Sequence, residues 1–171
     1  SVEEVHPTNS PASPTPVTDG RYVYVYFGSA GLIAFDFSGN LVWEKRLGPF
    51  PSDWGSASSP VLFGNTLLLN VDTDGDDFLL AVDKMTGKTI WQTPRGRVTR
   101  SWSTPVIWNA NGKDEIVISG SQRVKGYDPI SGKELWVVDG LTELLEEFAD
   151  WHEVNLIVTT GGTGLSPRDN T

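Results

Sequence analysis

The sequence predicts a mainly β protein that contains three four-stranded β-propeller blades, followed by a short helix–strand–loop α/β segment. The main evidence is a pattern that occurs three times: an Asp enters a turn, a Gly follows within four residues, and a Trp comes soon after. The repeated residues are Asp36, Trp43, Asp83, Trp91, Asp128 and Trp136. The tryptophans are 48 and 45 residues apart, which is the spacing typical of propeller blades.

A second marker opens each copy of the repeat. Pro-Val pairs begin at Pro16, Pro60 and Pro105, spaced 44 and 45 residues apart. Residues 1–19 are rich in Pro, Ser and Thr, so we expect loop there, with an edge strand near Pro16. β-Formers then predict strands over residues 22–27, 32–37 and 41–43.

The other two copies repeat this arrangement of short strands and turns. Turn signals occur at Gly64-Asn65 and Asn111-Gly112, among others. The expected strands of the second blade are 61–63, 66–71, 78–82 and 89–92, and those of the third blade are 106–108, 115–119, 124–127 and 134–138. The sequence therefore predicts one propeller unit over residues 1–140, with a domain boundary near Gly140.

The repeated Asp and Trp residues have a structural explanation. A carboxylate at the start of a tight turn can accept backbone N–H bonds, and the glycine that follows can adopt a positive φ. Each indole can cover the apolar seam between neighbouring blades. We therefore interpret these residues as parts of the scaffold, because a ligand site would not need the same residues in every repeat.

Composition restricts the classes of function. The net charge of −9 argues against binding to nucleic acid, because like charges repel. The chain has no cysteine, which excludes disulfides and thiolate metal sites, and no apolar run long enough to predict a membrane span. Three blades do not close a ring, since propellers have four to eight. We therefore expect a fragment or fusion whose open blade edges meet missing blades, a protein partner or another copy.

The pattern Ala-x-Asp, Thr-Gly-Lys and Trp, followed by Ser/Thr-Pro-Val, resembles the PQQ-like β-propeller repeat over residues about 10–140. The resemblance implies a non-catalytic scaffold or binding module in the periplasm or outside the cell. Some members are quinone-dependent dehydrogenases, which is a weaker alternative. Those enzymes use an adjacent cysteine pair and a calcium ion, and this cysteine-free sequence argues against the quinone.

An acidic stretch in the second repeat is a candidate metal site. Asp72, Asp74 and Asp76 alternate along a loop, and carboxylates of this kind suit a hard cation such as calcium. The glycine of the stretch, Gly75, lies at the fourth loop position, whereas an EF-hand requires a glycine at the sixth. A solvated hairpin turn explains the same residues.

The segment after Gly140 follows a different pattern. Residues 142–150 have helical spacing of apolar side chains, and residues 154–160 form an apolar strand that ends in a glycine-rich loop. This string resembles the molybdopterin-binding (MoaB/Mog, gephyrin N-terminal) family over about 142–171. The resemblance implies a molybdopterin or Mg-nucleotide site formed by Thr160, Gly161, Gly162, Thr163, Gly164 and Asp169.

Two functions therefore remain open from the sequence. The first is a propeller scaffold without a cofactor, because the repeats contain no nucleophile paired with a base. The second is an enzyme of molybdenum cofactor biosynthesis that resembles molybdopterin adenylyltransferase. This alternative would place the chain in the cytoplasm.

Overall fold

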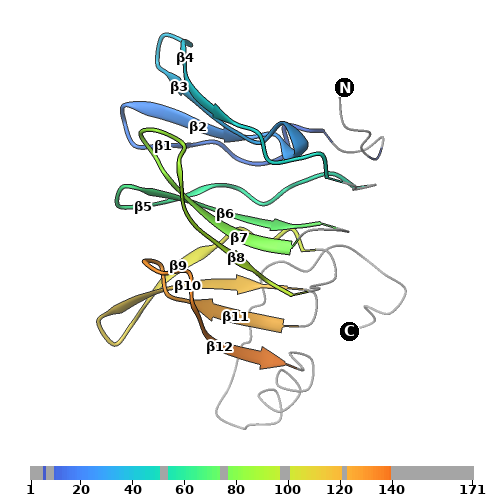
Figure 1. The fold of residues 1–171 in the computed structure, drawn as a ribbon, viewed down its shortest axis with the longest axis vertical. Helices are drawn as coiled ribbons and strands as arrows, with labels where there is room; N and C mark the ends of the chain where they lie inside the picture. The colour runs from blue at the N-terminus through green and yellow to red at the C-terminus, as the bar shows by residue number, and fades with distance from the viewer. Residues whose placement is uncertain are drawn as a thin grey trace, which may run out of the picture.

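The computed structural model of the chain describes His6 and residues 10–50, 54–73, 77–96, 101–120 and 123–139. Three four-stranded antiparallel sheets follow one another along the chain and stack face to face (Figure 1). The prediction of three four-stranded blades is confirmed. Residues 140–171 lie outside the described residues, so the helix, strand and glycine-rich loop expected there stay predictions.

Each sheet has the simplest order, in which every strand pairs with the next one in sequence. The first sheet contains β1 (Val17–Thr18), β2 (Tyr22–Tyr26), β3 (Leu32–Asp36) and β4 (Leu41–Lys45), with a 3₁₀ turn η1 (Gly28–Ala30) between β2 and β3. The second contains β5 (Val61–Phe63), β6 (Thr66–Asp72), β7 (Asp77–Asp83) and β8 (Thr89–Pro94). The third contains β9 (Val106–Ala110), β10 (Lys113–Ser119), β11 (Arg123–Tyr127) and β12 (Glu134–Asp139).

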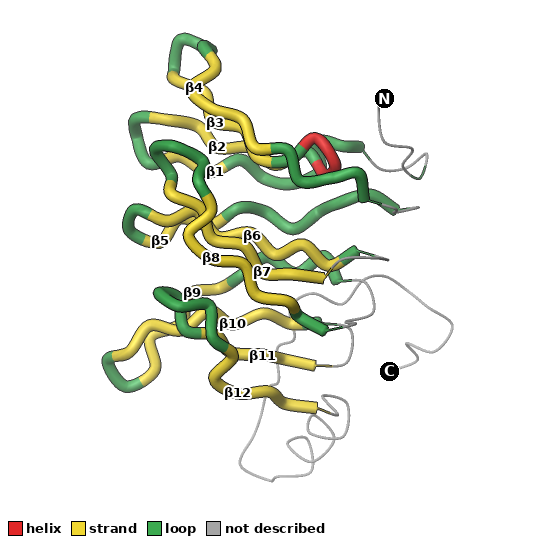
Figure 2. The backbone as a smooth tube through the Cα atoms, in the orientation of Figure 1, coloured by secondary structure: helices red, strands yellow, loops and turns green. Residues whose placement is uncertain are grey.

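Short hairpin turns join the strands on one side of the stack, where Figure 2 shows them as green loops at the left. Between β9 and β10, Asn111 and Gly112 have φ values of 52° and 82°. Two consecutive positive φ angles are typical of the type I′ turn, which matches the twist of antiparallel strands. The Asn-Gly pair is therefore the local cause of this hairpin.

The third and fourth strands of each sheet share an irregularity. Their register shifts at Ala34/Phe35, Ala81/Val82 and Gly126/Tyr127. Just before each shift, a small residue pairs with the repeated tryptophan: Ala34 with Trp43, Ala81 with Trp91 and Gly126 with Trp136. A small partner leaves room for the indole on that face of the sheet.

The core lies between the sheets, and the middle sheet is covered on both faces. Leu67, Leu69 and Leu80 belong to a cluster shared with the first sheet, whereas Leu68 and Leu79 belong to a cluster shared with the third. Alternate residues of a strand point to opposite faces. Strands β6 and β7 are therefore continuous apolar runs, while in the outer sheets strands such as β3 and β10 alternate between buried and more exposed residues.

Among the described residues, no helix is long and apolar enough to cross a membrane.

Candidate functional site

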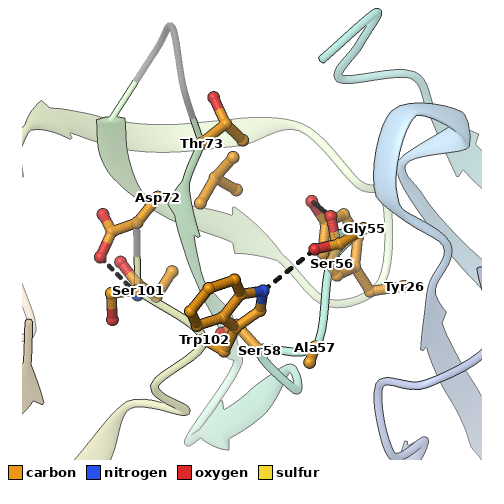
Figure 3. Close-up of a pocket in the computed structure, with 11 residues that line it drawn as sticks. Tyr26, Gly55, Ser56, Ala57, Ser58, Asp72, Thr73, Ser101 and Trp102 are labelled. Carbon is orange, nitrogen blue, oxygen red and sulfur yellow. Dashed lines mark hydrogen bonds between the residues drawn. The ribbon is translucent and has the colours of Figure 1, made fainter. Parts of the chain in front are cut away.

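A small cavity opens between the first and second sheets, beside the segments that lead into β5 and β9 (Figure 3). Its walls include Tyr26 from β2, residues 55–58, the end of β6, and Trp102. The cavity volume is about 10 Å³, close to what a single water molecule needs. Pockets for organic ligands are typically hundreds of cubic ångströms, so this cavity is far smaller than such a pocket.

Two buried polar atoms of this cavity have no hydrogen-bond partner among the described residues. They are the hydroxyl oxygen of Ser58 and the amide oxygen of Asn70. The indole N–H of Trp102 donates to the carbonyl of Gly55 at 3.1 Å, which closes one wall of the cavity (Figure 3). Buried polar groups are nearly always bonded to protein or ordered water. A water molecule in the cavity would supply the partner that such buried oxygen atoms need.

A buried ion pair lies next to the cavity. The Nε of Arg95 donates to Oδ1 of Asp72 at 2.8 Å, and its Nη2 donates to Oδ2 at 3.2 Å. Both side chains are fully buried. Two parallel bonds of this kind give the pair a defined geometry as well as charge compensation. Asp72 lies at the end of β6, and Arg95 follows β8 directly.

The ion pair continues into the third sheet. Nη1 of Arg95 donates to the hydroxyl of Tyr127 on β11 at 2.9 Å. Nζ of Lys125 donates to the carbonyl of Arg95 at 3.2 Å and to Oε2 of Glu134 at 2.8 Å. Burial raises the pKa of Tyr127 to about 12, so the phenol keeps its proton at neutral pH. We call Asp72, Arg95, Lys125, Tyr127 and Glu134 the polar network.

The candidate metal residues are only partly described. Asp72 is in the polar network, where its oxygens accept bonds from Arg95 and from the amide of Asn70. Asp74 and Asp76 lie outside the described residues. In the part of the chain that the structure describes, no group of three or more His, Cys, Asp or Glu side chains could hold a metal ion. Metal binding by the acidic stretch stays a prediction.

The repeated aspartates lie at the turns between the third and fourth strands. Oδ1 of Asp36 accepts bonds from the backbone N–H groups of Ser38 and Asn40. The side-chain and backbone bonds from Asn40 lower the pKa of Asp36 below its usual value.

The other two aspartates make the corresponding bonds. Oδ1 of Asp83 accepts from the backbone of Met85 and Thr86, and Oδ1 of Asp128 accepts from Ile130 and Ser131. The backbone bond from Ser131 is the largest cause that lowers the pKa of Asp128. Each carboxylate is thus used to hold its own turn.

Two of the three repeated tryptophans lie at the seams between sheets. The indole N–H of Trp43 donates to the carbonyl of Lys84 in the second sheet at 2.9 Å. Trp91 reaches the turn of the third sheet, and its buried N–H has no partner among the described residues. Trp136 stays on its own sheet, where its N–H donates to Glu115 at 2.7 Å.

The polar network was not predicted from the sequence. One signal could have indicated it. Lys125 lies on the same strand face as Tyr127 in β11, so a lysine occupies an inward-facing position where an apolar residue would be expected. The predicted cofactor residues Thr160–Gly164 and Asp169 lie outside the described residues, and the molybdopterin interpretation stays a prediction.

Stacked four-stranded antiparallel sheets that are joined by tryptophans define this chain as a β-propeller repeat protein. A family model described as outer membrane protein assembly factor BamB matches residues 4–145. The chain therefore belongs to this family of PQQ-like propeller proteins. The prediction of PQQ-like repeats is confirmed. A comparison with the curated proteins found no match.

Solved structures share the fold at low sequence identity. BamB from Moraxella catarrhalis has a TM-score of 0.57 at 19% identity, over 74% of this chain and 37% of that one. A europium-containing methanol dehydrogenase has a TM-score of 0.57 at 19% identity, over 72% and 24%. Quinohemoprotein alcohol dehydrogenase ADHIIG from Pseudomonas putida HK5 has a TM-score of 0.54 at 22% identity, over 74% and 20%. The chain thus spans well under half the length of these structures.

Proposed function

We propose that this chain acts as a non-catalytic β-propeller scaffold that binds a protein partner during outer-membrane protein assembly. One observation carries the proposal: the charged groups of the polar network are used in contacts that hold the second and third sheets together, from Arg95 to the hydroxyl of Tyr127 and from Lys125 to the carbonyl of Arg95. Arg95 compensates Asp72, and Lys125 bonds both Glu134 and the carbonyl of Arg95. Groups that are used in this way support the stacking of blades, whereas a catalytic acid or base must reach a substrate.

The cavity supports the same function. A volume of about 10 Å³ leaves space for a water molecule between the sheets. A quinone cofactor would need a far larger pocket, and the cysteine pair that the quinone enzymes use has no counterpart in this sequence. The likeness to two dehydrogenases is therefore a likeness of scaffold, at 19% and 22% identity.

An apolar stripe on the hairpin turns offers a surface for a protein partner. Phe37, Met85 and Ile130 follow the repeated aspartates, and their exposed fractions are 68%, 38% and 74%. Figure 1 places the turns that carry them, β3–β4, β7–β8 and β11–β12, on the same side of the stack. Exposed apolar side chains that gather on one side of a molecule are candidates for an interaction site. We call these three residues the rim stripe.

The family description also supports a location. It names an outer-membrane assembly factor, so we propose that the chain works on the periplasmic side of that membrane. Immunoblotting of fractionated cells that express the full-length protein tests this. Recovery in the periplasmic or outer-membrane fraction is expected, and recovery in the cytoplasm would contradict the proposal.

The binding experiment uses a partner of stated chemistry: labelled peptides that copy the strands of an outer-membrane β-barrel, with alternating apolar residues. Fluorescence anisotropy with the full chain should show saturable binding. Replacing the rim stripe by serine (Phe37→Ser, Met85→Ser, Ile130→Ser) should weaken binding at least about tenfold, as loss of an interface centre does. Equal affinity of the triple variant and the natural chain would show that the rim stripe is not the binding surface.

A matched control variant changes apolar residues that are exposed elsewhere. Val42, Ile90 and Leu135 lie on the fourth strands, and their exposed fractions are 37%, 51% and 47%. Val42→Thr, Ile90→Thr and Leu135→Thr should leave the affinity unchanged. In a separate assay, pyrroloquinoline quinone and calcium should produce no alcohol oxidation. Turnover in that assay would overturn the scaffold proposal.

A further inference from the structure

The turn between β7 and β8 exposes an apolar side chain and a basic one. Met85 has an exposed fraction of 38%, and Lys88, three residues further along the chain, is also exposed. The second sheet is covered on both faces by its neighbours, so both side chains stay exposed with a blade on each side (Figure 1). The exposure is therefore a property of the stacked blades and not of an open end of the stack.

The turn between β11 and β12 repeats this arrangement. Ile130 and Lys133 are exposed and are again three residues apart. The two lysines occupy the same turn position, because the carbonyl of each accepts the backbone N–H of the aspartate that starts its turn, at 2.8 and 2.9 Å. In the shorter turn of the first sheet, Asn40 takes this position, and its side-chain amide donates to Asp36 at 2.9 Å. The combination of an apolar residue and a lysine therefore belongs to the second and third turns.

The segments that carry the two lysines pack against each other. The hydroxyl of Thr93 on β8 donates to the carbonyl of Gly132 at 2.7 Å. The ring of Trp91 lies against the same glycine, where an added Cβ would meet it at 2.4 Å. Strand β8 begins directly after Lys88, and Gly132 directly precedes Lys133. The two turns therefore form one continuous surface.

The aspartates of these turns hold the turns themselves. Oδ1 of Asp83 accepts bonds from the backbone N–H groups of Met85 and Thr86 and from the hydroxyl of Thr86. Oδ1 of Asp128 accepts the corresponding three bonds within its own turn. A carboxylate that accepts three local bonds is directed toward its own backbone. These bonds leave the exposed lysines as the charged groups of the turns that are available for contact.

Other acidic groups near the turns also have partners within the chain. Asp19, between β1 and β2, forms an ion pair with Lys84 at 3.0 Å. Glu134, at the start of β12, forms an ion pair with Lys125 at 2.8 Å. Asp114, which follows the turn between β9 and β10, accepts a bond from an asparagine side chain at 2.7 Å. The carboxylates on this side of the stack are thus engaged within the protein.

The two lysines differ from these acids. Among the described residues, neither Lys88 nor Lys133 forms an ion pair or a hydrogen bond through its ammonium group. The whole chain carries a net charge of −9, so free cations beside exposed apolar residues are contrary to its overall composition. A surface with ammonium groups next to apolar side chains is complementary to a carboxylate next to an apolar side chain.

We propose that the rim stripe binds a partner segment that has carboxylates beside its apolar residues, and that Lys88 and Lys133 pair with these carboxylates. The inference rests on the proposed function, because it states the chemistry of the partner at the same surface. Met85 and Ile130 pack against the apolar residues of the segment and supply most of the affinity. Exposed ion pairs add little free energy each, but like charges repel, so the lysines select the sign of the partner's charge.

A protein segment fits this surface better than an anionic membrane does. Two lysines supply little attraction to a lipid surface, whose recognition takes a cluster of about four or more basic residues. The net charge of −9 opposes such binding as well. A membrane is therefore the competing outcome of the test.

The test compares three labelled peptides that share alternating leucines and differ only in their polar positions, which are Glu, Gln or Lys. Fluorescence anisotropy with the full chain at low salt should show that the Glu peptide binds about tenfold more tightly than the Lys peptide, with the Gln peptide between them. Sodium chloride at about 1 M should bring the three affinities together, because it screens exposed charges and leaves the apolar contact.

Reversing the charge of the two lysines should reverse the preference. In the double variant Lys88→Glu with Lys133→Glu, the Lys peptide should bind more tightly than the Glu peptide. The matched control is Lys45→Glu with Arg46→Glu, at the end of β4 that lies away from its turn. This control changes the net charge by the same amount and should keep the order of affinities of the natural chain. Circular dichroism checks that both variants fold.

Equal affinity for the three peptides at low salt would overturn the inference, while the rim stripe would keep its role if its serine variant still lost binding. An equal loss of preference in the control variant would also overturn it, because net charge alone would then explain the effect. Cosedimentation with vesicles of anionic lipid that is lost in the Lys88→Glu, Lys133→Glu variant would assign the lysines to a membrane. Binding of none of the peptides would contradict the proposed function as well.

Discussion

The seam between the first and second sheets is mainly apolar, with an ion pair of Asp19 and Lys84 at its edge, whereas the seam between the second and third contains the polar network. In the first seam, Tyr24, Leu32, Leu69 and Leu80 are buried against one another, and the N–H of Trp43 has a carbonyl partner. In the second, Arg95 and Asp72 are fully buried, Tyr127 belongs to the apolar cluster, and the N–H of Trp91 has no described partner.

The comparison shows that one repeat geometry accommodates two kinds of stabilisation. Sheet stacking and the contact between indole and glycine are the same in both seams. The apolar seam gains free energy from area removed from water. The polar seam depends on mutual compensation of charges whose desolvation is costly when either partner is lost. The two seams should therefore respond differently to mutation and to pH.

The largest expected effect comes from breaking the ion pair. Asp72→Ala leaves the guanidinium of Arg95 buried without an anion, which should lower the free energy of unfolding by about 3–5 kcal/mol. Urea unfolding followed by circular dichroism measures the loss. The double variant Asp72→Leu with Arg95→Met should recover most of it, because no uncompensated charge remains. A loss below about 1 kcal/mol for Asp72→Ala would show that the network is not a stabilising element.

Neighbouring leucines of β7 compare the two seams directly. Leu80 faces the first sheet and Leu79 the third, and both are fully buried. Leu80→Ala should cost about 3–4 kcal/mol, because a cavity in an apolar seam stays empty. Leu79→Ala should cost about 2 kcal/mol, since relaxation beside polar groups can admit water. The same unfolding assay checks both, and an equal or reversed order would contradict the assignment of the seams.

High pH should act on the polar seam through Tyr127. Its folded pKa is about 12, raised by burial above the value near 10 of an unfolded tyrosine. The resulting stability, about 2–3 kcal/mol, is fully present below pH 10 and is lost as pH rises toward 12.

Unfolding free energies measured between pH 9 and 12 test this. Tyr127→Phe should reduce the slope in that range. It should not abolish the slope, because burial also raises the pKa of Tyr24 in the first seam. An unchanged slope in Tyr127→Phe would mean that this phenol does not couple to folding.

The smallest expected effect distinguishes the two indole N–H groups. Trp43→Phe removes a bond to the carbonyl of Lys84, whereas Trp91→Phe removes an N–H without a described partner. Both changes lose similar ring volume, so their difference isolates the hydrogen bond. Trp43→Phe should be the more destabilising by about 1 kcal/mol in thermal unfolding. If Trp91→Phe costs more, the N–H of Trp91 must have a partner such as an ordered water.

Much of the fold could be predicted because its signals are local. Alternation of apolar residues, β-formers and Gly-containing turns predicted all the strands found among the described residues, with boundaries that differ from the structure by no more than two residues. The strand over 61–63 was predicted with its observed bounds, and that over 115–119 begins at Lys113 in the structure. A hairpin requires only neighbouring residues, so its sequence is enough to predict it.

The polar network could not be predicted in the same way. The sequence pattern groups Asp72 with its neighbours Asp74 and Asp76 as candidate metal ligands. In the structure, the carboxylate of Asp72 pairs with Arg95, which is 23 residues away. Arg95 then reaches Tyr127 across 32 residues. Which distant side chains meet depends on how the sheets stack, and no local sequence pattern indicates which side chains these are.

The sequence by itself determined the repeat, the strands, the turns and the blade-like class, because period-two patterning and turn chemistry act over a few residues. The tertiary structure alone decided that one seam is mainly apolar and the next contains the fully buried pair of Asp72 and Arg95, and that Trp43 and Trp91 cross to the following blade while Trp136 stays on its own. The physical reason is that a side chain becomes buried, or has its charge compensated, only when the neighbouring sheet packs against its own sheet.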